Sequence, residues 1–445
     1  MASWLIELRT TLISAWQTYA QPRVLVMLFF GFSAGLPFLL VFSTLSAWLR
    51  DVGIERATIG YFSWVGILFS IKVIWSPVVD QLRLPFLHRW FGQRRSWLLL
   101  AQAGIICALL LMTVTGPVGH LERFAWLALL VAFSSATQDI CIDAYRIESA
   151  PQELQGAMAA GYIFGYRLAL LIAGAGAFYL AEFYSWAIAY QGMALCMLVG
   201  VITTLIVREP DIPPREFLSH GVGHWLHQSI VMPFMEFFNR FGGHALVLLL
   251  FISIYRISDI TMGVMANPFY LDMGYGKDEI ANIAKFFGFF MTIAGSAIGG
   301  VVVIRMGTAR PLLAGAILVA TTNLLFAVMA TGDASLTWLA VVISADNLSA
   351  GFANVCFIAY LSGLTSRQFT ATQYALFSSL MTLPGKFIGG YSGEVVDAWG
   401  YPLFFSYAAV LGVPAVLLAW YLLHRSKSGE AAHIDTTAEN HHTLR

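Results

Sequence analysis

Long apolar runs constrain the fold of this chain more than any other feature of its sequence. A helix that crosses the hydrocarbon core of a bilayer needs about 20 mostly apolar residues, and twelve stretches satisfy that rule. Because lipid offers no hydrogen bonds to the backbone, such stretches must fold as helices. The sequence therefore predicts an all-α membrane protein whose twelve transmembrane helices lie at about 24–46, 59–79, 97–115, 123–146, 156–179, 185–207, 244–266, 279–303, 311–330, 336–360, 373–392 and 402–424.

Composition supports a membrane protein and excludes several other classes. Charged residues make up 11% of the chain, whereas a soluble domain carries about 25%. The formal net charge is zero, which argues against a nucleic-acid partner. The first residues lack the pattern of a cleaved signal peptide. The four cysteines have neither the spacing of a disulfide framework nor that of a metal site, so we expect no metal and no cofactor.

The predicted helices divide into two sets of six around a long connection. Two such halves are typical of transporters built by duplication, in which the substrate site lies near the midplane between the repeats. We expect an interfacial amphipathic helix at 1–23, a six-helix bundle at 24–207, a cytoplasmic linker with an interfacial helix at 208–243, a second six-helix bundle at 244–424 and a polar cytoplasmic tail at 425–445.

A weak internal repeat supports this division. An Ala-Tyr pair ends the fourth predicted helix at 144–145, and another ends the tenth at 359–360. In that register Asp139 aligns with Asn354.

The distribution of lysine and arginine predicts the orientation. With the N-terminus inside, 16 of these residues fall in inner segments and 4 in outer loops. Cytoplasmic loops carry the excess of positive residues in membrane proteins. We therefore expect both termini in the cytoplasm.

One stretch of the fourth predicted helix concentrates the polar side chains. A carboxylate at the bilayer centre costs about 3 kcal/mol or more, so Asp139 is expected to face a water-filled path. Asp143 and Arg146 lie on the same helical face. Depth along the helices allows an ion pair between Lys72 and Asp139. We expect Asp139 to carry a coupling proton. A dry cavity favours the protonated form of a carboxyl group, whereas an approaching cation favours the charged form.

Buried cations outnumber buried acids in the predicted helices, which favours an anionic substrate. The cations are Lys72, Arg167, Arg256, Lys285 and Lys386, and the acids are Asp139, Asp259 and Asp346. All of these except Asp139, together with Gln138 and Asn354, form the predicted substrate-binding set.

Structural alternatives remain open for several of these side chains. Arg256 and Asp259 are three residues apart and could satisfy each other. Lys285 and Lys386 could extend toward the membrane surface. Gln138 could cross-link two helices rather than bind substrate.

Asp143 and Arg146 also have a structural alternative, since both lie close to the inner surface. We favour an ion pair between them, because charges at the ends of membrane helices are usually solvated or paired.

Small residues recur at four-residue spacing in two predicted helices. Gly31 and Gly35 lie in the first, and Gly161 and Gly165 lie in the fifth. Such spacing lets helices approach closely. Static packing and a sliding role are equally compatible with it.

The connection between the second and third predicted helices resembles an inner-loop signature of the major facilitator superfamily. Residues 75–80 read Trp-Ser-Pro-Val-Val-Asp, and residues 92–97 read Gly-Gln-Arg-Arg-Ser-Trp. The resemblance implies an inner gate in which Asp80 pairs with Arg94 or Arg95. Asp143 and Arg146, at the inner end of the fourth helix, are assigned to the same gate.

Three segments together resemble the muropeptide permease (AmpG-like) family: 31–37 (Gly-Phe-Ser-Ala-Gly-Leu-Pro), 75–80 and 136–146. The resemblance implies twelve helices of the major facilitator type in the bacterial inner membrane. It also implies proton symport of anhydro-muropeptides, which are N-acetylglucosaminyl-anhydro-N-acetylmuramyl peptides, from periplasm to cytoplasm for peptidoglycan recycling. In some bacteria cytoplasmic muropeptides induce β-lactamase, which links such permeases to β-lactam resistance. The fold class usually works as a monomer.

Other functions remain as alternatives. Within transport, the substrate could be another anionic solute, such as a siderophore-like or coenzyme A-linked molecule. An intramembrane enzyme would need a catalytic constellation, for which Asp139 with Asp346 is the best case. The sequence contains no His-Glu-x-x-His motif and no phosphate-binding P-loop. A channel would need a selectivity filter, and no segment resembles one. We therefore expect a transporter and not an enzyme.

Overall fold

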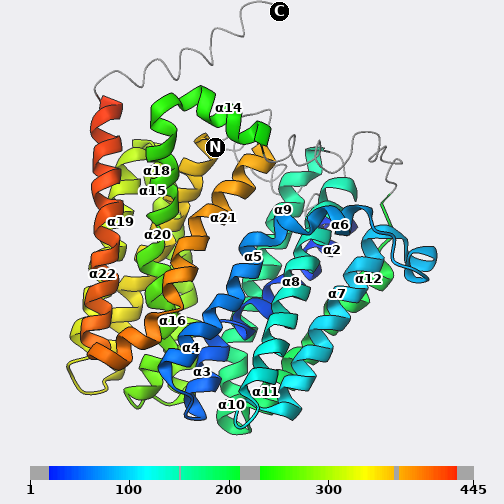
Figure 1. Ribbon diagram of the computed structural model, residues 1–445, viewed down its shortest axis with the longest axis horizontal. Helices are drawn as coiled ribbons and strands as arrows, with labels where there is room; N and C mark the ends of the chain where they lie inside the picture. Colours follow the sequence, from blue (N-terminus) through cyan, green and yellow to red (C-terminus); the bar gives the residue numbers. More distant parts are fainter. Residues whose placement is uncertain (1–19, 150–151, 211–230, 365–369, 428–445) are drawn as a thin grey trace, which may run out of the picture. The chain divides into compact units, whose positions relative to one another are not determined.

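Every regular element that the structure describes is helical (Figure 1). The structure is a computed structural model that describes residues 20–149, 152–210, 231–364 and 370–427. The predicted tail beyond 427 and most of the predicted N-terminal helix, at 1–19, lie outside the described residues, as does the first part of the linker at 211–230.

Ten of the described helices are long and apolar enough to cross a membrane. Two of the twelve predicted spans are not among them. The predicted span at 59–79 is broken into short helices, because two 3₁₀ turns, η1 (Ser63–Gly66) and η2 (Lys72–Ile74), interrupt it. The predicted span at 373–392 corresponds to α21 (Thr370–Gly389), which contains Lys386 and Pro384. The all-helical architecture is confirmed, and the count of twelve is not.

The chain forms two compact units. The first contains residues 1–55, 62–219 and 275–285. Its helices are α2 (Pro22–Leu40), α3 (Ser43–Asp51), α5 (Ile67–Ile71), α6 (Ser76–Gln81), α7 (Leu87–Thr115), α8 (Leu121–Ser149), α9 (Gln152–Leu171), the π-helical turn η3 (Ile172–Gly176), α10 (Ala177–Phe183), α11 (Trp186–Cys196), α12 (Leu198–Ile206) and α17 (Lys277–Glu279).

The second unit contains residues 56–61, 220–274 and 286–445. Its helices are α14 (Met232–Phe241), η5 (Gly242–His244), α15 (Ala245–Ile254), α16 (Ile257–Asp272), α18 (Gly288–Met306), α19 (Ala309–Met329), α20 (Leu336–Leu364), α21 and α22 (Ser392–Lys427). Two elements are divided between the units: all of α4 (Arg56–Phe62) but its last residue belongs to the second unit, and η6 (Ile280–Phe287) leaves the first unit after Lys285.

The same helix pairs pack in both units. In the first, α2 packs on α9, and α7 packs on both α8 and α11. In the second, α16 packs on α21, and α19 packs on both α20 and α22. Counted in chain order, these are equivalent pairs, so the two units are built on one packing plan.

Glycine brings α2 and α9 into backbone contact. A Cβ at Gly31 would collide with the carbonyl oxygen of Tyr162, and one at Gly165 with that of Leu28. The glycine spacing in the two helices thus accompanies a close approach, and the sequence did not indicate that the two helices would be partners. This close approach holds α9 against α2 beside the polar residues of α8.

Candidate functional site

An ion pair between Lys72 and Asp139 lies at the centre of the polar residues in the first unit. The lysine Nζ is 3.6 Å from Asp139 Oδ2, and the two side chains are 32% and 16% exposed. Lys72 opens the turn η2 at the break in the predicted second span, and Asp139 projects from α8. The depth estimate that allowed this pair agrees with the structure. Oδ1 of Asp139 is buried and has no hydrogen-bond partner among the described residues, so this oxygen is available to a proton or a donor.

Two neighbours of Asp139 fix the rotation of α8. Gln138 is fully buried; its Oε1 accepts from the Ser33 hydroxyl at 2.8 Å, and its Nε2 donates to the Ser33 carbonyl at 3.0 Å. The Trp75 indole donates to the Thr137 hydroxyl at 3.1 Å. The contacts of Gln138 cross from α8 to α2, which favours cross-linking over substrate contact for Gln138.

An aromatic cluster in the first unit includes one side chain that interacts with Asp139, a feature that the sequence did not indicate. The ring of Phe38 packs against Phe42, Phe69 and Tyr166 at centroid distances of 4.8, 5.9 and 6.4 Å. The Tyr166 phenol is close enough to Asp139 to interact electrostatically. These residues come from three separate segments of the chain, so no local sequence pattern predicts the cluster.

Arg167 follows Tyr166 on α9 and is half-buried. Within the described part of the chain, Asp139 forms its ion pair with Lys72 and none with Arg167. Its assignment to the substrate site therefore stays a prediction.

The predicted inner-gate arginines make contacts that the sequence did not indicate. Arg94 is 2% exposed and forms a two-pronged contact with Glu148, with Nε to Oε2 at 2.9 Å and Nη2 to Oε1 at 2.7 Å. Glu209 accepts the backbone N–H groups of Arg94 and Arg95 at 2.6 and 3.1 Å. It thereby caps the helix that restarts after Gly92, whose φ is +80°.

The remaining inner-gate residues are less tightly held. Arg95 donates to the carbonyl oxygens of Thr204 and Leu205. Arg146 and Asp143 form a long ion pair of 3.9 Å, and Asp143 is 54% exposed, in keeping with the favoured structural pairing. The side chain of Asp80 lies outside the described set, so its pairing with Arg94 or Arg95 stays a prediction.

In the second unit, Arg256 joins two of the predicted site residues. It forms an ion pair with Asp259, and its Nη1 donates to Asn354 Oδ1 at 3.2 Å. The three side chains line a small pocket with Tyr255 and with the small residues Gly315, Ala316, Ala350 and Ala353. Asp259 and Arg256 thus satisfy each other in part, as the structural alternative expected, yet the guanidinium also reaches the pocket.

Three other predicted site residues lie apart from this pocket lining. Asp346 lies two turns before Asn354 on α20, and its carboxyl interacts electrostatically with Asp259. Lys285 belongs to the first unit, where its Nζ lies 5.3 Å from the centroid of the Phe178 ring. Lys386 is half-buried in α21, directly after the Pro384-Gly385 pair.

In the part of the chain that the structure describes, no group of three His, Cys, Asp or Glu side chains is placed to hold a metal ion. The ionisable groups instead form cation–carboxylate pairs within each unit. Such pairs can exchange partners with a charged solute or a proton.

Comparison with known proteins identifies the family. The model of the Major Facilitator Superfamily matches residues 24–389. The anhydromuropeptide permease of Escherichia coli K12 is 34% identical over 403 residues, covering 90% of this chain and 79% of the permease. A Rickettsia conorii protein assigned as transporter AmpG 4 is 34% identical over 402 residues, covering 90% of this chain and 96% of that protein.

Solved structures share the fold at low sequence identity. The nucleoside transporter NupG aligns with a TM-score of 0.67 and 14% identity, covering 91% of this chain and 99% of NupG. A POT family transporter aligns with a TM-score of 0.70 and 13% identity, covering 92% of this chain and 97% of that one. The relatives are transporters and not enzymes. The chain therefore belongs to the major facilitator superfamily, and within it to the AmpG-like family.

Proposed function

We propose that this transporter imports anhydro-muropeptides from periplasm to cytoplasm by proton symport. The observation that carries the substrate assignment is the 34% identity to the E. coli anhydromuropeptide permease, spread over 90% of this chain. Identity over nearly the whole length is expected to preserve the parts that contact substrate as well as the scaffold.

The ion pair in the first unit supports proton coupling. Asp139 has one oxygen near Lys72 and the other without a hydrogen bond in the described residues. A substrate carboxylate that approaches Lys72 would draw the cation away from Asp139. The carboxylate of Asp139 would then be left buried without its counter-charge and would take up a proton. Substrate binding and proton binding thereby favour each other.

The second unit supplies a further anion-binding element. Arg256 keeps guanidinium contacts with both Asp259 and Asn354 beside a pocket. Guanidinium groups bind carboxylates through paired hydrogen bonds, so Arg256 is a suitable partner for the peptide carboxylates of a muropeptide. We assign Lys72, Arg167, Arg256, Lys285 and Lys386 to the anionic substrate, and Asp139 to the proton.

The cycle is alternating access in the bacterial inner membrane, with both termini in the cytoplasm and the monomer as the working unit. The excess of lysine and arginine in the predicted inner segments supports this orientation. The inner cluster of Arg94, Glu148 and Glu209 lies at the predicted cytoplasmic ends of its helices, where a gate would act.

Uptake of radiolabelled anhydro-muropeptide into proteoliposomes tests the proposal. One pH unit supplies about 1.4 kcal/mol per proton, so symport of one proton accumulates substrate about ten-fold when the membrane potential is held at zero. We expect Asp139→Asn to lose this accumulation while still equilibrating substrate. Asp333→Asn, at an exposed aspartate outside the predicted site and gate, is the control and should accumulate substrate as the parent does.

Each part of the proposal has its own refuting result. Gradient-driven accumulation that survives in Asp139→Asn would remove the proton role of Asp139. Parent uptake that ignores the gradient would leave a facilitator. If folded parent protein takes up no muropeptide but does take up a coenzyme A-linked or siderophore-like anion, the substrate assignment is wrong.

A further inference from the structure

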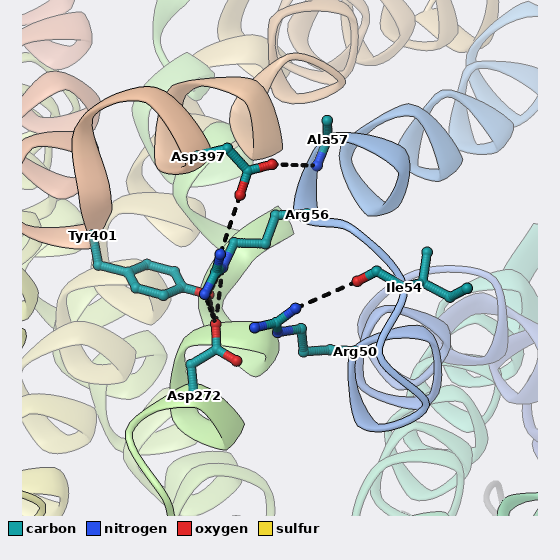
Figure 2. A network of polar contacts seen from close by, with 7 residues as sticks. All are labelled: Arg50, Ile54, Arg56, Ala57, Asp272, Asp397 and Tyr401. Carbon is teal, nitrogen blue, oxygen red and sulfur yellow. Dashed lines mark hydrogen bonds and ion pairs between the residues drawn. The ribbon is translucent and has the colours of Figure 1, made fainter.

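Arg56 is held by a network of acceptors within the second unit (Figure 2). Its guanidinium lies 2.7 Å from Asp272 Oδ2 and 3.1 Å from Asp397 Oδ1, and its Nε donates to the Tyr401 hydroxyl oxygen at 3.2 Å. Tyr401 in turn donates to Asp272 at 2.7 Å. The backbone N–H of Ala57 donates to the second oxygen of Asp397. This set of contacts is called the Arg56 clamp below.

Lys277 is held in a similar way within the first unit. Its Nζ lies 3.2 Å from Asp51 Oδ2 and 3.8 Å from Glu182 Oε2. The Trp186 indole donates to the same Asp51 oxygen at 2.7 Å. These contacts are called the Lys277 clamp below.

The two clamps are copies of one sequence pattern. Residues 51–56 read Asp-Val-Gly-Ile-Glu-Arg, and residues 272–277 read Asp-Met-Gly-Tyr-Gly-Lys. Each copy has an aspartate, a glycine two residues later and a cation five residues later. Both glycines adopt positive φ, +83° for Gly53 and +92° for Gly274, which side chains with a Cβ rarely adopt. The cation of each copy pairs with the aspartate of the other copy.

Each cation belongs to a short segment that packs in the unit formed mainly by the other half of the chain. Residues 56–61 belong to the second unit, and residues 275–285 belong to the first. The first of these segments is in backbone contact with its surroundings. A Cβ at Gly60 would collide with the carbonyl oxygen of Gly390, and one at Gly393 with that of Arg56.

We propose that Arg56 and Lys277 form a duplicated, reciprocal clamp whose two members release together in each transport cycle. The proposal rests on the proposed alternating access. Residue 56 is joined by the peptide chain to residue 55 of the first unit, and residue 275 to residue 274 of the second. Opening requires the halves to part at the outer side, where both connections are predicted to lie. Each of the segments 56–61 and 275–285 packs in one unit and is joined by the peptide chain to the other unit. Movement that withdraws one segment from its unit therefore strains the contacts of the other segment.

The two clamps differ in strength. The Arg56 guanidinium contacts two carboxylates and a phenol, whereas the Lys277 ammonium contacts two carboxylates at longer distances. A planar guanidinium loses less freedom per hydrogen bond than a lysine ammonium. Arg56 is therefore the stronger member.

Hydrogen exchange on the purified full chain in lipid nanodiscs, without substrate, tests the coupling. We expect Arg56→Gln to speed amide exchange about ten-fold in residues 56–61 and to speed it in residues 275–285 as well. Lys277→Gln should speed exchange in the same two segments by a smaller factor. Arg123→Gln is the matched control, since Arg123 is an exposed arginine at another predicted outer position, and it should leave both segments unchanged.

The segment that does not contain the substitution decides the outcome. Faster exchange confined to the substituted segment would mean two independent structural ties and would overturn the proposal, as would unchanged exchange in both. If Arg56→Gln does not fold, Gly60→Ala tests the same clamp by steric means, and Arg56→Lys should retain most of the protection. These readouts need no transport, so a failed muropeptide uptake assay leaves the result intact.

Discussion

The ion pair between Arg94 and Glu148 makes a sharp prediction about stability. Arg94 is buried and Glu148 is largely buried, with exposed fractions of 2% and 12%, and they share two hydrogen bonds of 2.7 and 2.9 Å. Removal of one partner takes both of these charge-assisted hydrogen bonds away from the other. Measured costs of breaking such pairs are about 3–5 kcal/mol.

The magnitude for this pair follows from its geometry. Charge-assisted two-pronged contacts are about twice as strong as neutral hydrogen bonds, and burial removes most of the screening by solvent. We expect Arg94→Met and Glu148→Met each to lower the free energy of unfolding by about 3 kcal/mol. The double variant Arg94→Met with Glu148→Met should be less destabilised than the sum of its single changes by about 2 kcal/mol or more.

A double-mutant cycle measured by denaturation in mixed micelles checks this prediction. The pair Asp143–Arg146, 3.9 Å apart with a 54% exposed aspartate, serves as the control pair. Exposed pairs contribute about 1 kcal/mol or less, so its coupling energy should be much smaller. Equal coupling energies for the two pairs would refute the reasoning from burial and geometry.

Three further predictions concern packing, hydrogen bonding and pH. Gly165→Ala should cost about 1–3 kcal/mol of stability, because the new Cβ would collide with the Leu28 carbonyl oxygen. Thermal denaturation checks this prediction. Gly300→Ala is the control, because a Cβ at Gly300 meets open space. Ser33→Ala leaves Gln138 Oε1 buried without its donor and should cost about 1–3 kcal/mol by the same assay. Burial alone would lower the pKa of Arg56, but hydrogen bonds to Tyr401, Asp272 and Asp397 raise it above the usual arginine value. A cation whose pKa is raised by folding stabilises the protein fully at any pH below its pKa in the unfolded chain. Melting curves of the parent should therefore show no loss of stability from Arg56 up to about pH 10. Arg56→Lys should lose stability above about pH 10, because the pKa of an unfolded lysine lies there.

The sequence predicted the helices better than their interruptions. Hydropathy is a local property, and it located the ten helices that are long and apolar enough to span a membrane. The predicted span at 59–79 is interrupted where it packs closely against another segment. A Cβ at Gly66 would collide with the Phe42 ring, and residue 42 lies on a different segment. Gly66 and Pro77 are local signals for an interruption, but mean hydropathy over the segment does not register them.

The candidate site was predicted where depth along a helix was sufficient, and missed where rotation mattered. Depth brought Lys72 and Asp139 to the same level, and the structure pairs them. The contacts of residue 94 with Glu148 and Glu209 depend on which way α7 and α8 face and on the course of the chain after α12. When a helix is apolar on all sides, its sequence has little hydrophobic periodicity, so the direction in which each face points is only weakly predicted.

The repeat also explains why the two units have different chemistry on one packing plan. Asp139 aligns with Asn354 in the register set by the two Ala-Tyr pairs. In the first unit a cation contacts the carboxylate of Asp139, and in the second Arg256 contacts the amide oxygen of Asn354. A carboxylate can take up a proton, whereas an amide at the same place accepts a hydrogen bond at any pH. The two contacts therefore differ in chemistry: the acceptor beside Lys72 can be protonated, whereas the amide beside Arg256 stays neutral and the guanidinium pairs instead with the carboxylate of Asp259.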